Sequence, residues 1–239
     1  MAPLAEVLCS RFGILEALQT ATTVRGQVIE LKAILENHGN IPGVLIGHSW
    51  GAWLAYLTAA DHPSLVKKLI LVASGPFLDR DAKGIMETRL RRLNKGNRTR
   101  LLELQQILAG GDVPLRDQLF KEFGELISKA DAYDALPLPD ESIPCRFDMF
   151  RSVWNEAARM RSTGKLLDIG KRIQCPVIAI HGDHDPHPAE GVRQPLSTVI
   201  RNFRFLLLKN CGHDPWKERH ARGPFFDALE KELIRTPHN

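Results

Sequence analysis

The chain has 239 residues, 44% of them hydrophobic and 25% charged, which is ordinary for one globular domain or for one domain with a sizeable insertion. Its net charge of +4, from 32 basic and 28 acidic side chains, is mild, and no nucleic-acid-binding module is recognisable, which argues against a nucleic-acid partner. No apolar run approaches the ~20 residues needed to cross a bilayer, so we expect no membrane partner.

The N-terminus and the cysteines indicate a cytoplasmic protein. Residues 1–9 lack the basic start and the long apolar core of a signal peptide, and Glu6 interrupts their apolar patch. We therefore expect a helix of the fold there. The four cysteines are scattered without C-x-x-C spacing, which is typical of a reducing compartment and not of a disulfide framework.

Short apolar runs alternate with helical patterns, as in a parallel sheet built from strand–helix–strand units. We predict strands at residues 12–17, 43–48, 69–73, 177–181 and 203–208, and helices at residues 24–37, after residue 49 and at residues 224–234. Residues 78–168 differ in character and indicate an all-helical, highly charged insertion. We interpret its six basic residues between positions 89 and 100 as a solvent-facing helix side, with an anion-binding surface as the alternative.

The segment from Gly47 to Gly51 has the pattern G-x-S-x-G, with a strand before it and a helix after it. A turn this sharp requires small residues two before and two after the serine. It projects the hydroxyl of Ser49 from the carboxyl end of the sheet. It also aims the helix N-terminus and the backbone N–H of Trp50 at any oxyanion that forms there. The pattern predicts a nucleophilic serine, with helix capping as the alternative role.

A nucleophilic serine needs an imidazole that takes its proton and a carboxylate that orients the imidazole. Both residue types follow the fourth and fifth predicted strands. The candidates near the fourth strand are His181, Asp183, His184, Asp185 and His187, and the candidate after the fifth is His213. Each role therefore has at least one candidate later in the chain than Ser49.

Three motifs resemble those of the α/β-hydrolase family, in its cap-bearing esterase and iminopeptidase-like branch: G-x-S-x-G, Gly182-x-x-Asp185 and Gly212-His213. The resemblance covers essentially the whole chain. It implies a mostly parallel sheet flanked by helices, with residues 1–77 and 169–239 as the core and residues 78–168 as a helical cap. It also implies that Ser49 is the nucleophile, Asp185 the orienting acid and His213 the general base.

Three neighbours of these residues are candidates for the oxyanion or substrate site. In the family pattern Trp50 gives its backbone N–H to the oxyanion, and its ring is expected to line the pocket. His48 precedes the nucleophile. Trp216, which follows the base, either lines the pocket or packs in the core.

The imidazoles and carboxylates of residues 181–187 also suggest a zinc site, because such groups at short spacing can converge on one ion. Their order matches neither H-E-x-x-H nor the metallo-β-lactamase pattern. We therefore expect no metal ligands in this chain.

The family pattern includes a second oxyanion N–H, from a loop after the third strand that a His-Gly dipeptide announces. The resemblance begins inside the helix that should follow this loop, which predicts an N-terminal truncation that removes the first strands. In the family's strand order, a lost strand lies between those predicted at residues 12–17 and 43–48. We therefore expect a gap in the sheet, with unpaired backbone edges.

The resemblance implies a cytoplasmic serine hydrolase that transfers the acyl group of a small ester or amide to water, with no cofactor. Its expected partner is a small acyl substrate; neither the identity of that substrate nor the oligomeric state follows from the residues. One alternative is a cofactor-free haloperoxidase-like or lyase-like enzyme on the same fold. The other is a truncated binding protein that has lost turnover.

Overall fold

The computed structural model describes residues 2–110, 114–137 and 146–234. Its helices are α1 (Ala2–Leu8), α2 (Val24–His38), α3 (Trp50–Asp61), α4 (Ile85–Arg92), α5 (Lys95–Ala109), α6 (Arg116–Asp131), α7 (Phe147–Ser162), α8 (Lys165–Ile169), α9 (Glu190–Val199) and α10 (Arg222–Ile234). Its strands are β1 (Gly43–His48), β2 (Val66–Val72), β3 (Val177–Gly182) and β4 (Phe203–Leu208). None of the helices in these ranges has both the length and the apolar character that crossing a membrane requires.

Within the described residues, the strands form one parallel sheet in the order β1-β2-β3-β4. In register, Ile46 of β1 lies opposite Ile70 of β2, and Ile70 lies opposite Ile178 of β3. The two inner strands are buried almost throughout. Their near-continuous apolar sequences therefore suit a parallel sheet that is covered on both faces.

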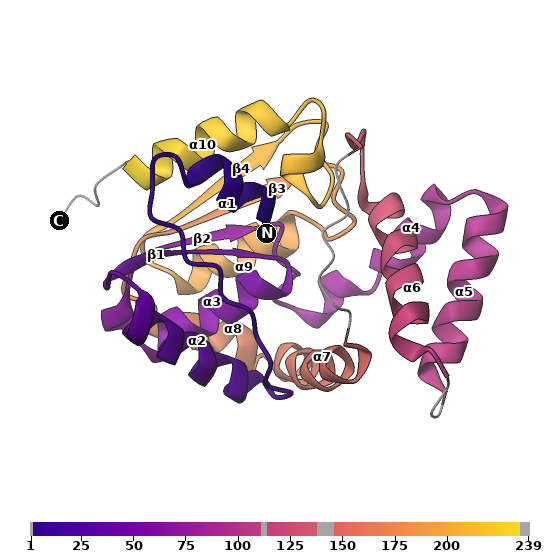
Figure 1. Ribbon diagram of the computed structural model, residues 1–239, viewed down its shortest axis with the longest axis horizontal. Coiled ribbons are helices and arrows are strands. Elements are labelled where there is room, and N and C mark those ends of the chain that lie inside the picture. The colour runs from indigo at the N-terminus through magenta and orange to yellow at the C-terminus, as the bar shows by residue number, and fades with distance from the viewer. Residues whose placement is uncertain (1, 111–113, 138–145, 235–239) are drawn as a thin grey trace.

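Helices cover both faces of this sheet, with α1 and α10 on one side and α2, α3 and α8 on the other (Figure 1). Each face has its own core, because alternate side chains of a strand point to opposite faces. Ile70 and Ile180 belong to the same buried cluster as Phe225 of α10. Leu69 belongs to the cluster that contains Trp53 of α3. The predicted parallel sheet with flanking helices is confirmed.

The strand predicted at residues 12–17 is wrong. These residues form neither strand nor helix, and the side chains of Ile14 and Leu15 are 39% and 43% exposed. An apolar run becomes a strand only when a neighbouring strand pairs with it, and none of the described strands does so here. The gap was expected between this strand and β1, and it does not form in that way because the outer strand is absent. Among the described strands β1 is the outermost, and β1 to β4 pair without interruption. The other four predicted strands are confirmed.

The segment between β2 and β3 is helical in its described parts, and α4, α5 and α6 stand to one side of the sheet (Figure 1). Two of its basic residues, Arg89 and Arg92, are partly buried and do not simply face solvent as expected, whereas Arg91, Lys95 and Arg98 are exposed. Arg89 pairs with the buried Asp131, and Arg92 donates to the carbonyl of Ala130 at 3.2 Å. Arg98 donates to the carbonyl of Leu90 at 2.8 Å. These guanidinium groups join the inserted helices through hydrogen bonds to two backbone carbonyls and one carboxylate.

Candidate active site

Ser49 lies on the turn between β1 and α3. Its backbone has φ 53° and ψ −117°, a positive-φ conformation that non-glycine residues rarely adopt and that is concentrated at functional sites. Its N–H donates to the carbonyl of Val72 at 3.0 Å, which ties the turn to β2. The chain therefore passes from strand to helix at Ser49 through a strained residue.

The two glycines of this turn are not equivalent. A Cβ atom on Gly47 would lie 2.1 Å from the carbonyl oxygen of Gly51, so no side chain fits there. A Cβ atom on Gly51 meets nothing described within 4 Å outside its own helix backbone. The expectation that both positions must be small is wrong for Gly51, because the Cβ position of that residue points away from the contact with β1.

Asp185 lies in the loop after β3, and its side chain is fully buried. Its Oδ2 accepts a hydrogen bond from Nδ1 of His213 at 2.8 Å. The rival carboxylate, Asp183, instead accepts from the backbone N–H of Cys211 at 3.3 Å and lies 3.6 Å from the exposed ammonium of Lys209. The fold therefore brings His213 together with Asp185 and leaves Asp183 on the outer side of the loop.

The charges around Asp185 keep it ionised. Burial alone would raise the pKa of its carboxyl group. The attraction of His213 and the hydrogen bonds from His187 and His213 outweigh burial and hold the pKa well below its ordinary value. The carboxylate that accepts the hydrogen bond from His213 is therefore ionised near neutral pH.

His213 lies in the loop after β4, where its backbone N–H donates to the carbonyl of Asp131 at 3.1 Å. Burial lowers the pKa of its imidazole, but the charge and hydrogen bond of Asp185, assisted by Asp214 and Asp131, raise the pKa to about 9. A carboxylate can only accept, so Nδ1 carries the proton of the shared hydrogen bond. Nε2 is then the nitrogen that can exchange a proton with another group.

The other histidines of the site have different surroundings. His181 is fully buried and donates from Nε2 to the carbonyl of His187 at 2.8 Å. The ring of His184 lies against Tyr133, with centroids 5.2 Å apart. His48 donates from Nε2 to the carbonyl of His213 at 3.0 Å. Burial, followed by repulsion from His213, lowers the pKa of His48 to about 4, so it stays neutral at physiological pH.

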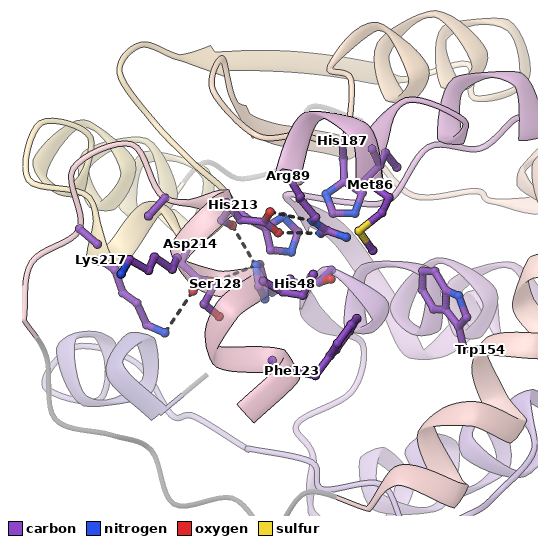
Figure 2. A pocket seen from close by; sticks show the side chains of 18 of the residues that line it. His48, Met86, Arg89, Phe123, Ser128, Trp154, His187, His213, Asp214 and Lys217 are labelled. Carbon is purple, nitrogen blue, oxygen red and sulfur yellow. Dashed lines mark hydrogen bonds and ion pairs between the residues drawn. The ribbon is translucent and has the colours of Figure 1, made fainter. Parts of the chain in front are cut away.

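Ser49 and His213 line one cavity of about 820 Å³. In Figure 2, His48, His187 and His213 lie together near Arg89, and Trp154 stands farther along the wall. The described wall is mostly apolar and comes largely from α4, α6 and α7. These helices contribute Ile85, Met86, Phe120, Phe123, Gly124, Ile127, Phe150 and Trp154.

The rings of two predicted site residues lie elsewhere. Trp50 and Trp216 are absent from the described lining of the cavity. The indole N–H of Trp50 donates to the side-chain oxygen of Gln27 at 2.8 Å, so the ring turns toward α2, where it finds an acceptor. Trp216 is buried in the core beside Phe225, which agrees with the packing alternative. The role of the Trp50 backbone N–H stays a prediction.

Each carboxylate in the described lining already has a partner. Asp131 accepts two hydrogen bonds from the guanidinium of Arg89, at 2.6 and 2.7 Å. Asp214 lies 3.1 Å from Lys217, and Glu218 accepts from three backbone N–H groups. Sequence reasoning missed the Arg89–Asp131 pair, because no local pattern links two residues on different helices.

Asp185, His187 and His213 also form a cluster whose potential ligand atoms lie within 4.8 Å of one another. The two distances from nitrogen to carboxylate oxygen, 2.7 and 2.8 Å, are those of hydrogen bonds. A metal ion would have to displace both Nδ1 protons. The hydrogen bonds therefore account for the cluster by themselves.

Comparison with known proteins identifies the family pattern in this chain. A model of the alpha/beta hydrolase family matches residues 12–223. The chain is 27% identical over 207 residues to monoacylglycerol lipase ABHD6 of Bos taurus, and 25% identical over 227 residues to the protein of the same name of Homo sapiens. These matches cover 82% and 91% of this chain but 57% and 62% of the relatives. The chain therefore spans less than two thirds of the length of either relative.

Solved structures agree on the architecture. VinJ matches with a TM-score of 0.61 at 19% identity, over 88% of this chain and 72% of that protein. Proline iminopeptidase of Mycobacterium smegmatis matches with a TM-score of 0.58 at 18% identity, over 90% of this chain and 73% of that protein. At such identities the likeness concerns the fold.

Proposed function

This chain belongs to the alpha/beta hydrolase family, and on that premise we propose that it is a serine hydrolase that cleaves carboxylic esters by acyl transfer. Ser49 is the nucleophile, His213 the general base and Asp185 the acid that orients it. The observation that carries this proposal is the 2.8 Å hydrogen bond between His213 Nδ1 and the buried carboxylate of Asp185, at a cavity that Ser49 also lines.

The reaction follows from the protonation states of these groups. Nε2 of neutral His213 takes the proton of the Ser49 hydroxyl as the oxygen attacks the ester carbonyl. Asp185 stabilises the imidazolium that forms, and the tetrahedral oxyanion takes a hydrogen bond from the backbone N–H of Trp50. The imidazolium then protonates the leaving alcohol. Water releases the acyl group by the same two proton transfers, which regenerates Ser49.

The paired charges of the cavity favour esters over peptide N-termini. An aminopeptidase needs a free carboxylate for the substrate ammonium, but Asp131, Asp214 and Glu218 are all engaged. Two further acidic residues lie on α6, and the first of them, Glu122, pairs with Arg100 at 2.7 Å. Glu125 is absent from the described lining. An amine bound here would therefore lose its hydration without gaining a counterion.

The apolar wall supports an ester with a hydrocarbon acyl chain. The rings of Phe120, Phe123, Phe150 and Trp154 offer a surface on which methylene groups gain by leaving water. The name of the two relatives, monoacylglycerol lipase, agrees with such a substrate. Because these rings come from residues 78–168, we propose that this segment is the cap that selects the acyl group.

Intact-mass labelling with a fluorophosphonate, which reacts with activated serines, tests the proposal. The full chain is compared with Ser49→Ala, His213→Ala and, as a matched control, Ser128→Ala, whose hydroxyl lies in the same cavity. We expect one adduct in the wild type and in the control, and none in the other two. Hydrolysis of p-nitrophenyl butyrate should follow the same order. A folded wild-type chain that forms no adduct would contradict the proposal.

A further inference from the structure

The carboxylate of Asp185 lies between two imidazoles, and only one of them belongs to the proposed mechanism. Oδ2 accepts from Nδ1 of His213 at 2.8 Å, and Oδ1 accepts from Nδ1 of His187 at 2.7 Å. The two rings tilt toward each other, with centroids 4.7 Å apart. Each imidazole therefore holds a different oxygen of the same buried acid.

His187 is itself held in a fixed geometry. Its backbone N–H donates to the same Oδ1 at 2.9 Å, and its carbonyl accepts from the fully buried His181 at 2.8 Å. Burial lowers the pKa of the His187 imidazole, so the ring is neutral with its proton on Nδ1. The loop thus presents a fixed hydrogen-bond donor to Asp185 at any pH near neutrality.

We propose that His187 is a positioning residue of the site: its Nδ1–H holds Oδ1 of Asp185 so that Oδ2 faces His213. This inference rests on the proposed function for its catalytic meaning, but the hydrogen bond and its effect on His213 exist independently of turnover. His187 neither attacks substrate nor accepts the serine proton in this scheme. It acts through the acid.

The hydrogen bond from His187 to Asp185 also affects the basicity of His213. A hydrogen-bond donor on Oδ1 stabilises the negative charge of Asp185. The carboxylate of Asp185 then stabilises a protonated His213 less strongly. Removing the donor therefore raises the pKa of His213 further. The charges of Asp214 and Asp131 also raise the pKa of His213, and the charge of Arg89 lowers the pKa of His187. His48 stays neutral beside His213.

Two variants of nearly equal shape separate the hydrogen bond from simple packing. His187→Asn keeps an N–H donor on a branch at Cγ, near the place of Nδ1, whereas His187→Leu keeps the branch and loses the donor. His184→Gln is the control, because His184 is on the same loop and its ring lies against Tyr133. The backbone N–H of His187 stays on Oδ1 in all three variants.

We expect His187→Leu to lower kcat roughly tenfold with little change in KM, the effect of one hydrogen bond to a charged group. The acidic limb of its pH profile should move to higher pH. His187→Asn should recover most of kcat and the wild-type profile. If His187 only lines the cavity, the Asn and Leu variants will differ from the wild type in KM and share its pH profile, which would overturn the proposal.

Imidazole ¹⁵N NMR makes the test independent of turnover. The pKa of His213 should be higher in the Leu variant than in the wild type and close to the wild type in the Asn variant. Equal values in all three proteins would overturn the proposal even if the chain is an active hydrolase. The expected shift in a chain that fails to hydrolyse esters would uphold the hydrogen bond and reject the proposed function. If the Leu variant does not fold, His187→Met replaces it, because the methionine side chain also lacks an N–H donor.

Discussion

Two imidazoles of the cavity, His48 and His213, have opposite pKa shifts although their ring centroids are 4.8 Å apart. The pKa of His213 is raised to about 9 and that of His48 is lowered to about 4. Burial lowers the pKa of both rings, but for His213 the charge and the hydrogen bond of the ionised Asp185 outweigh it, whereas repulsion from His213 lowers the pKa of His48 further. His213 is thus the ring that gains and loses a proton in the working range.

The raised pKa of His213 predicts an alkaline activity profile. A general base must be unprotonated, so activity is lost as the pH falls below the pKa. We expect kcat/KM for a p-nitrophenyl ester to rise about tenfold per pH unit up to about pH 9 and then level off. The Ser49→Ala protein supplies the background at each pH. A plateau that already begins near neutrality would show that Asp185 raises the pKa of His213 less than the geometry implies.

The glycines beside Ser49 allow a second prediction at the residue scale. Gly47→Ala places a methyl group 2.1 Å from a backbone oxygen, whereas Gly51→Ala meets open space within its helix. We expect Gly47→Ala to lose the labelling of Ser49 and to unfold at markedly lower denaturant concentration. Gly51→Ala should keep both properties, since alanine favours a helix over glycine. Equal behaviour of the two variants, measured by urea unfolding and fluorophosphonate labelling, would argue against the close strand–helix contact.

At the scale of elements, α4 and α6 are joined by a buried ion pair. The side chain of Asp131, at the end of α6, is 3% exposed and accepts two hydrogen bonds from Arg89 of α4. The carbonyl of the same aspartate accepts from the backbone of His213. The pair therefore connects the inserted helices to the loop that carries the proposed base.

Breaking this pair should be costly. Arg89→Met leaves the carboxylate of Asp131 buried without a counterion, and we expect the free energy of unfolding to fall by about 3–5 kcal/mol. The matched control is Arg100→Met, because Arg100 pairs with Glu122 at the surface, where solvent screens the charges; little change is expected. Urea unfolding followed by circular dichroism measures both.

The double variant Arg89→Met/Asp131→Leu tests the reason for the loss. It removes both charges and should recover part of the stability, since apolar groups can replace a buried pair. A double variant less stable than Arg89→Met would indicate that the geometry of these helices depends on Asp131 in another way.

For the whole molecule, the cavity lies where the carboxyl ends of the strands meet the inserted helices. Ser49 follows β1, Asp185 follows β3 and His213 follows β4, so one edge of the sheet supplies the proposed chemistry. The apolar wall comes from α4, α6 and α7. The proposed catalytic residues and the proposed acyl-binding wall thus lie in different parts of the chain. A substitution in the wall can therefore change acyl selectivity without altering the catalytic residues.

Gly124 of α6 offers a way to test that division. It lines the cavity, and a Cβ atom there meets nothing described within 4 Å outside its own helix backbone. In the wild type we expect kcat/KM to rise about fourfold per added methylene of a p-nitrophenyl ester until the cavity is full. Gly124→Leu should keep activity on the shortest esters and lose the gain for longer ones, while Gly124→Ala should resemble the wild type. A uniform loss at all chain lengths would contradict the acyl-pocket role.

Local sequence determined the elements and the order of the candidate residues. The turn at Ser49 is readable because a strand, a small residue and a helix must follow one another within a few positions. The loops of Asp185 and His213 are readable because parallel strands bring their carboxyl ends to one edge. These features can therefore be predicted from residues that are close together in the sequence.

Tertiary structure decided what depends on distant partners. Residues 12–17 have the apolar character of a strand but lack a paired neighbour, and the ring of Trp50 follows an acceptor on α2. Arg89 finds its carboxylate 42 positions away. In the sequence, His187 was only an alternative candidate for the base. Its hydrogen bond with Asp185 is seen only in the folded loop. Hydrogen bonds and burial select such partners in space, so the sequence by itself determined the chain order of the site, and the packed fold decided which groups touch.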